Sequence, residues 1–192
     1  MESILRSNIE RTIAQPISDE EFKLFSGFFF EKSYEKKTVL VEEGSQCKYV
    51  YFIQKGAAYS YILNEHGEKH AIQFALEGHW ITDQYSFFSG KPGIYTIETL
   101  EHSSMLVLNH EKYEKICSIS HVFEHFFHKL IQNAFISLQY RLAKTNSEDA
   151  EHRYKEFSKL YPAFVQRIPQ YLIASYLGIK PQSLSRIRKE MS

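Results

Sequence analysis

The stretch Gln170-Tyr-Leu-Ile-Ala-Ser-Tyr-Leu-Gly-Ile-Lys-Pro-Gln-Ser-Leu-Ser-Arg-Ile-Arg-Lys189 predicts two short helices joined by a tight turn. Pro169, just before it, suits the first position of a helix, where its missing N–H costs nothing. Gly178 stands where the turn needs an unusual backbone angle, and Pro181 restarts a helix. Ala174 is small where the two helices must cross. The apolar residues recur at helical spacing and predict a shared core, typical of a helix-turn-helix: Leu172, Ile173, Tyr176, Leu177, Leu184, Ile187 and Met191.

The polar side chains of the second helix have the chemistry that reads DNA. Glutamine pairs with adenine, arginine with guanine, and serine with bases or phosphates. From position 166 to the end there are five basic residues and one acid, a net +4 in a chain whose net charge is zero. The basic charge is therefore concentrated where phosphates would lie, although a plain two-helix corner with a solvated basic face is the alternative. The predicted DNA-binding residues are Lys180, Gln182, Ser183, Ser185, Arg186, Arg188 and Lys189.

Length and composition set the class of protein. The 192 residues, 43% of them hydrophobic, are enough for one large domain or a medium one with a small one. No apolar run of 18 residues is present, and the first residues lack the order of a signal peptide, so we expect a cytoplasmic protein without a membrane anchor. The two cysteines, Cys47 and Cys117, indicate neither a disulfide framework nor a metal or iron–sulfur site.

The first 120 residues predict a β-rich domain with flanking helices. Leu5, Ile9 and Ile13 indicate an opening helix, and Ser18 with Glu21 forms a capping box that starts a second one. Short segments rich in β-branched and aromatic residues follow, separated by glycine turns: 38–41, 49–53, 57–63, 70–76, 95–100 and 104–108. Such spacing predicts an antiparallel jelly-roll barrel, and the fold class is therefore α+β.

After the strands, 111–117 predicts a short helix and 121–146 a long one. The long helix has more apolar surface than one face of a barrel needs, so we expect its second face to pair with a second copy in a homodimer. Packing entirely within the chain is the alternative. The predicted interface residues are Phe123, Phe127, Leu130, Ala134 and Leu138. Ser147 is then a candidate N-cap for the next helix. The predicted domains are 1–120, the sensory barrel; 121–146, the dimerisation helix; and 147–192, the DNA-binding domain.

This order of parts resembles the Crp/Fnr family of bacterial transcription regulators over essentially the whole chain, and its short-tailed members of Bacteroidetes-type bacteria in particular. The motifs that carry the resemblance are Leu40-Val-Glu-Glu-Gly44, Tyr51-Phe-Ile-Gln-Lys-Gly56, the Glu77-Gly78 turn and Ile173–Arg188. The resemblance implies a homodimer that senses a small molecule in its barrel and reads a two-fold symmetric site on double-stranded DNA. RNA polymerase is a further candidate partner.

Departures from the family pattern bear on the effector. Members that bind cyclic nucleotides hold the phosphate with Gly-Glu and, about ten residues later, Arg-Ser or Arg-Thr. Thr82-Asp83 and Gly93-Ile94 stand at these positions here, and Lys91 is the nearest cation. Without the arginine a cyclic phosphate loses a charge-assisted hydrogen bond, which argues against cyclic AMP. Thr82, Asp83 and Lys91 remain the candidate effector-binding residues, with the effector unknown and no cofactor expected.

The second helix also departs from the family. Pro181 and Gln182 replace a base-reading arginine and an acid, whereas Arg186 matches the second reading arginine. The operator sequence known for the family is therefore not assumed for this chain. The alternative function is a ligand-sensing or protein-interaction module with degenerate DNA binding.

An enzyme on a similar barrel is the remaining rival. A cupin-type metal site needs a His-x-His pair, and none occurs among the nine histidines. Nucleophile elbows and phosphate-cradling glycine loops are missing as well. The sequence therefore predicts no enzyme activity, no catalytic residues and no metal site.

Overall fold

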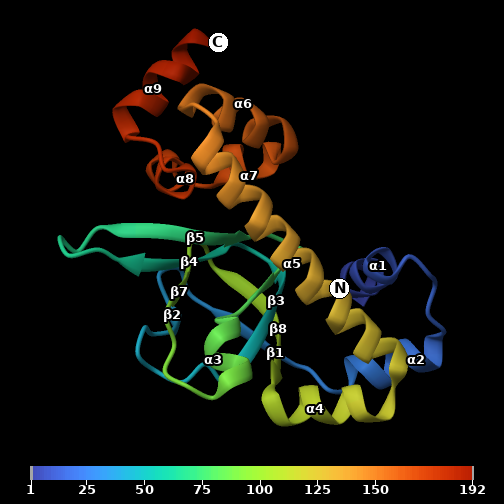
Figure 1. Cartoon of the computed structure of the whole chain (residues 1–192). Coiled ribbons are helices and arrows are strands. Elements are labelled where there is room, and N and C mark those ends of the chain that lie inside the picture. The colour runs from blue at the N-terminus through green and yellow to red at the C-terminus, as the bar shows by residue number, and fades with distance from the viewer. Residues whose placement is uncertain (1, 192) are drawn as a thin grey trace.

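Two four-stranded antiparallel sheets face each other in the computed structural model, which describes residues 2–191 (Figure 1). One sheet has the order β1-β8-β3-β6 and the other β2-β7-β4-β5. The strands are β1 (Phe30–Tyr34), β2 (Val39–Val41), β3 (Tyr49–Lys55), β4 (Ala58–Leu63), β5 (Lys69–Ala75), β6 (Trp80–Ile81), β7 (Thr96–Thr99) and β8 (Ser103–Asn109). The α+β class and the jelly roll are confirmed, while β1 and the two-residue β6 are additions to the expected strands.

Alternating side chains of the two sheets fill the space between them. Ile53, Ile97, Met105 and Val107 have no exposed surface, as residues on the inner faces of a sandwich should. The turn from β3 into β4 needs a glycine, because Gly56 has φ +99° and a Cβ there would lie 2.6 Å from the carbonyl oxygen of His102.

Five helices surround the barrel: α1 (Glu2–Ile13), α2 (Asp19–Ser26), α3 (Gln84–Ser89), α4 (His110–Ile119) and the long α5 (His121–Ser147). The predicted capping box is present, since Ser18 accepts from the amide of Glu21 and the Glu21 carboxylate accepts from the amide of Ser18. Leu5, Ile9 and Ile13 are buried as predicted. The six-residue α3 was not expected from the sequence.

Phenylalanines of the first half of α5 lie in an aromatic cluster with α2 and the barrel. The ring of Phe123 stacks on Phe25 of α2 with centroids 4.2 Å apart, and Phe127 lies 5.8 Å from the same ring. Trp80 of β6 joins the cluster, and its indole N–H donates to Asn8 of α1 at 2.8 Å. The N-terminal helices and the start of α5 are thereby fixed to one sheet.

The C-terminal helices are α6 (Ala150–Leu160), α7 (Pro162–Arg167), α8 (Gln170–Leu177) and α9 (Pro181–Glu190). Three predictions about their ends are wrong. Ser147 is the last residue of α5 and donates to the carbonyl of Ala143, so Asp149 is the N-cap of α6. Pro169 is the N-cap of α8 rather than its first residue, and Met191 is 45% exposed rather than in the core. Among residues 2–191, no helix is long and apolar enough to cross a membrane.

Candidate nucleic-acid interface and effector site

The turn between α8 and α9 is closed by backbone hydrogen bonds around a left-handed glycine. Gly178 has φ +64°, and the amide of Ile179 donates to the carbonyl of Ala174 at 2.8 Å. This is the bond that ends a helix in a Schellman motif. The second helix begins at Pro181 without a side-chain cap from Lys180, as the sequence predicts. Helix, turn and helix therefore follow the predicted order.

The apolar face of α9 anchors it, and the polar face is exposed. Leu184 and Ile187 are 1% and 5% exposed, and they pack with α8 residues in one core. The predicted DNA-binding residues Lys180, Gln182, Ser185, Arg186, Arg188 and Lys189 are exposed, and Ser183 is half-buried. Gln182 and Arg186 are four residues apart and lie on one edge of the helix. Arg186 forms a solvent-exposed ion pair with Glu190, and the charged atoms are 3.9 Å apart. In Figure 1, α9 lies on the far side of the C-terminal helices from the barrel.

The candidate effector site is built around a buried aspartate. Asp83 has no exposed surface and is the N-cap of α3. Its Oδ1 accepts from the amide of Ser86 at 3.0 Å, and its Oδ2 accepts from the amides of Ile94 at 2.7 Å and Tyr95 at 3.0 Å. The carboxylate therefore takes three backbone N–H groups, the kind of donor that binds a phosphate at a helix start. In this protein the three amides are therefore already paired with an internal side chain.

Of the other two candidate effector residues, one is hydrogen-bonded within the barrel and the other is exposed. Thr82 donates its hydroxyl to the carbonyl of Tyr49 at 2.9 Å and contacts the Cys47 sulfur at 3.3 Å. Lys91 is exposed. Gly93 is buried, and a Cβ there would lie 3.0 Å from both Asp83 Oδ2 and the Ser45 carbonyl oxygen. A side chain at position 93 therefore has no room while Asp83 keeps its place.

The C-terminal helices cover an open edge of the barrel. β5 is the last strand of its sheet, and such an edge leaves backbone groups unpaired. Ser175 of α8 satisfies two of them, because its hydroxyl donates to the carbonyl of Lys69 at 3.2 Å and accepts from the amide of Ala71 at 3.1 Å. Beside these bonds the ring of Phe74 lies 5.1 Å from that of Tyr176. Barrel and C-terminal helices thus share one hydrophobic core.

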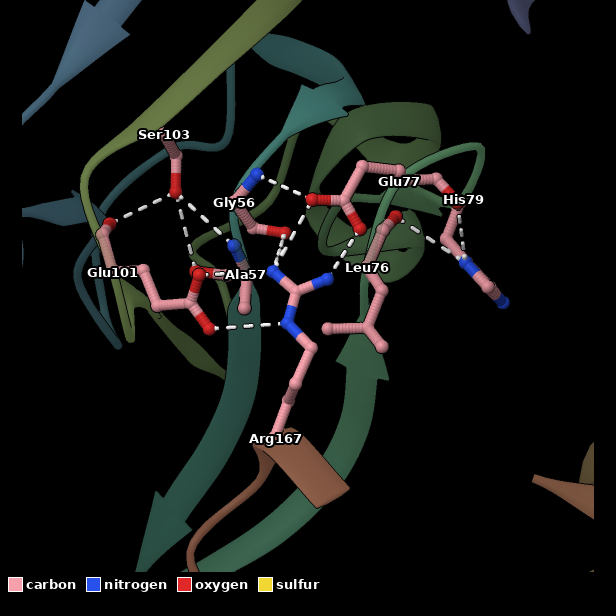
Figure 2. Close-up of polar contacts among 8 residues, drawn as sticks. All are labelled: Gly56, Ala57, Leu76, Glu77, His79, Glu101, Ser103 and Arg167. Carbon is pink, nitrogen blue, oxygen red and sulfur yellow. Dashed lines mark hydrogen bonds and ion pairs between the residues drawn. The ribbon is translucent and has the colours of Figure 1, made fainter. Parts of the chain in front are cut away.

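Arg167, the last residue of α7, closes the same junction with charge (Figure 2). Its guanidinium contacts Glu77 at 2.5 and 3.2 Å and Glu101 at 2.9 and 3.3 Å, and it donates to the carbonyl of Gly56 at 3.2 Å. Glu77 in turn accepts from the amide of Gly56 at 2.8 Å. One arginine thereby joins three turns of the barrel to the C-terminal helices, and we call this cluster the Arg167 clasp.

The charges of the clasp shift its acid–base equilibria. Burial acts to raise the pKa of Glu77, but hydrogen bonds from Arg167 and from backbone amides outweigh it and leave the pKa lowered. Glu77 and Glu101 raise the pKa of Arg167. A carboxylate with a depressed pKa stabilises the folded state above its ordinary titration range, and this contribution is lost as the pH falls through the lowered pKa. The clasp is therefore complete at neutral pH.

The long helix has two different halves. Of the predicted interface residues, Phe123 and Phe127 are 0% and 3% exposed inside the aromatic cluster, and Leu130 is half-buried against it. Ala134 and Leu138 are exposed. All residues from 132 to 140 are exposed, and the large apolar ones are Phe135, Ile136, Leu138 and Tyr140, followed by Leu142. The surface open to a partner therefore lies in the second half of the helix.

No group of three or more His, Cys, Asp or Glu residues in the described part of the chain is placed to hold a metal ion. Cys47 and Cys117 are both free thiols, and burial raises the pKa of Cys117 to about 11.

Several known proteins resemble this chain in sequence or in fold. Residues 31–120 match the cyclic nucleotide-binding domain family. FixK2 from Bradyrhizobium japonicum superposes with a TM-score of 0.72 and 20% identity, over 85% of this chain and 84% of that one. The c-di-GMP-responsive global regulator CLP from Xanthomonas campestris gives 0.67 and 10% identity over 91% of both. A Eubacterium rectale protein described as a transcriptional regulator of the Crp/Fnr family gives 0.68 and 16%, over 91% and 83%. A search of curated sequences finds no match.

Residues 31–120, which include the barrel strands from β2 to β8, are thus similar to cyclic nucleotide-binding domains. The whole chain has the fold of Crp/Fnr regulators, as the sequence motifs predicted.

Some residues of these sites were missed by the sequence reasoning. Ser175, Arg167 and Glu101 were not singled out, and nothing in their local sequence marks them. Glu77 was quoted only as part of a turn motif. Asp83 was identified as a candidate ligand contact, and its hydrogen bonds to the amides of Ser86, Ile94 and Tyr95 were not foreseen.

We predict that cyclic AMP and cyclic GMP do not bind the barrel, because Asp83 holds the amides that a phosphate would need and position 93 supplies no arginine. Isothermal titration calorimetry with either nucleotide at millimolar concentration should give only the heat of dilution. Micromolar affinity for either one would show that the Asp83 carboxylate is displaced on binding.

Proposed function

We propose that this chain is a DNA-binding transcription regulator of the Crp/Fnr type, which acts as a homodimer in the bacterial cytoplasm rather than as an enzyme. The observation that carries the proposal is the exposed edge of α9, with Gln182 and Arg186 held outward by buried Leu184 and Ile187. A helix fixed in this way can enter a major groove with its N-terminal residues against the bases. RNA polymerase remains a candidate partner of such a regulator.

The charge distribution supports the same partner. The segment from position 166 onward carries a net +4, and the rest of the neutral chain carries −4. One of its cations, Arg167, is neutralised in the clasp, whereas Lys180, Arg186 and Lys189 are exposed on or beside α9. Basic residues gathered on one face provide sequence-independent attraction to phosphates, and Gln182 and Arg186 add base reading.

Two copies would associate through the second half of α5. Ile131, Phe135, Leu138 and Leu142 recur at steps of four, three and four, which is the spacing of a coiled-coil seam. Phe135, Leu138 and Leu142 are 51–59% exposed within one chain. A parallel seam of this kind buries them and relates the two α9 helices by a two-fold axis. This interface replaces Phe123 and Phe127 with residues that a partner can reach.

The barrel remains the proposed place of an effector, with Thr82, Asp83 and Lys91 as candidate residues. The bonds of Asp83 restrict that effector to one that does not need the amides of Ser86, Ile94 and Tyr95. A module that has lost DNA binding is the alternative function, and the following test separates the two.

We predict different losses from two changes on α9. Arg186→Ala should cost about 1–3 kcal/mol of binding free energy and relax the base preference at one position of each half-site. The reason is that Arg186 would contact the edge of a base in the major groove. Lys189→Ala should weaken binding to all sequences alike and reduce the salt dependence by about one unit per half-site, because Lys189 contacts phosphate. Selection from a random duplex pool, followed by titration at several salt concentrations, measures both effects.

The selected sites should be palindromes with half-sites about one helical turn apart. Lys129→Gln, which removes a cation from α5 rather than α9, is the matched control and should change neither affinity nor preference. A pool that enriches no symmetric sequence would favour the module without DNA binding.

We predict that Leu138→Glu combined with Leu142→Glu gives monomers in light scattering, because two buried charges per chain would face each other in the seam. Ile136→Glu is the control on the same helix. Ile136 is as exposed, at 57%, but lies about 200° around the helix from Leu138, since each residue turns by about 100°. A dimeric double variant, or a monomeric Ile136→Glu protein, would place the interface elsewhere.

A further inference from the structure

A pocket of about 240 Å³ lies where the end of α5 meets α6 and α8. Four aromatic rings line it: Tyr140 of α5, Phe157 of α6, Tyr161 between α6 and α7, and Tyr176 of α8. The volume is below the roughly 300–1,000 Å³ of drug-sized ligand sites, yet above the roughly 150 Å³ that holds benzene in an engineered cavity. It therefore suits a molecule of one or two rings, or a chain of similar bulk.

The charged residues around this pocket are three cations and one acid: Arg141, Lys144, Arg153 and Glu156. The acid is engaged within the protein, because Glu156 accepts from the Tyr140 hydroxyl at 2.5 Å and contacts Lys144 at 3.7 Å. Lys144 also pairs with Glu148. The other two cations that line the pocket are Arg141 and Arg153.

Arg153 has a structural task. Its guanidinium donates to the carbonyls of Leu177 at 3.0 Å and of Gly178 at 3.4 Å, and it also bonds the carbonyl of Glu148. These carbonyls lie at the ends of α8 and α5, where helices leave backbone acceptors unpaired. Its donors are therefore used within the protein.

Arg141 differs from Arg153, because its contact with the ring of Tyr176 leaves the N–H groups of its guanidinium available as hydrogen-bond donors. Its central carbon lies 4.4 Å from the ring centroid of Tyr176, and among residues 2–191 it forms no ion pair with a carboxylate. The N–H groups of a guanidinium lie in its plane and match a carboxylate in a two-pronged fashion. An arginine whose guanidinium lies over a ring can still donate hydrogen bonds from its in-plane N–H groups to an organic anion.

We propose that this pocket binds a small amphipathic organic acid, with its apolar body among the rings and its carboxylate on Arg141. Tyr140 of α5 and Tyr176 of α8 would contact opposite sides of that body. The occupant would therefore tie the long helix to the C-terminal helices. On α5, Tyr140 lies about 200° around the helix from the seam residue Leu138 and faces away from the seam, whereas Arg141 lies about 60° from Leu138 and flanks the seam.

The test uses the full chain and 2-naphthoate as the probe, with 2-naphthalenemethanol as its uncharged counterpart. Isothermal titration calorimetry at neutral pH should show saturable binding of the acid, one per chain. The alcohol should bind about tenfold more weakly, because the charge-assisted bond to Arg141 is lost. This readout does not depend on DNA binding.

Three variants locate the site. Arg141→Gln should weaken the acid by about tenfold and leave the alcohol unchanged. Ser137→Phe, which fills the pocket from its exposed wall on α5, should abolish both. Lys129→Gln, a cation on the same helix far from the pocket, should change nothing. The proposal is overturned if the wild-type chain shows no saturable binding, if Arg141→Gln binds the acid as tightly, or if Ser137→Phe still binds it.

Discussion

The contact between α8 and the open edge of β5 is the interaction on which the arrangement of this protein depends. Ser175 pairs two backbone groups of that edge, Phe74 and Tyr176 pack beside it, and the Arg167 clasp closes its end. Edge strands left open invite other chains, so the covering helix protects the barrel as well as placing α9. With α8 fixed, the turn at Gly178 directs α9 away from the barrel, where a duplex can reach it.

The barrel adds a second constraint, because the amides of Ser86, Ile94 and Tyr95 are satisfied from within by the buried side chain of Asp83. Hydrogen bonds to a carboxylate are charge-assisted, which makes them strong. The segment from Ser86 to Tyr95 is thereby ordered by the protein's own carboxylate. Ligand control would then act elsewhere, and the Arg141 pocket at the joint of α5 and the C-terminal helices is positioned for it.

The parts of the fold that depend on a local sequence pattern could be predicted from the sequence. The helix-turn-helix followed from periodic apolar residues around Gly178, and the strands followed from β-branched runs between glycine turns. The partner of Asp83 could not be foreseen, because its amides belong to Ile94 and Tyr95, across a loop. The predicted interface stripe mixes covered and exposed residues for a similar reason. Periodicity marks Phe123 and Leu138 alike as apolar, but only the fold shows that Phe25 covers the former.

The amide of Ala71 provides the most direct measurement of the central claim, that the C-terminal helices are docked on β5 through Ser175 and the clasp. This amide points out of the sheet edge, and its acceptor is the Ser175 hydroxyl. Hydrogen exchange followed by NMR should find it protected in the wild-type chain and fast in Arg167→Ala, while the amide of buried Phe52, within β3, stays protected in both. Fast exchange at Ala71 in the wild-type chain would contradict docking, and equal protection in Arg167→Ala would show that the clasp does not hold the helices in place.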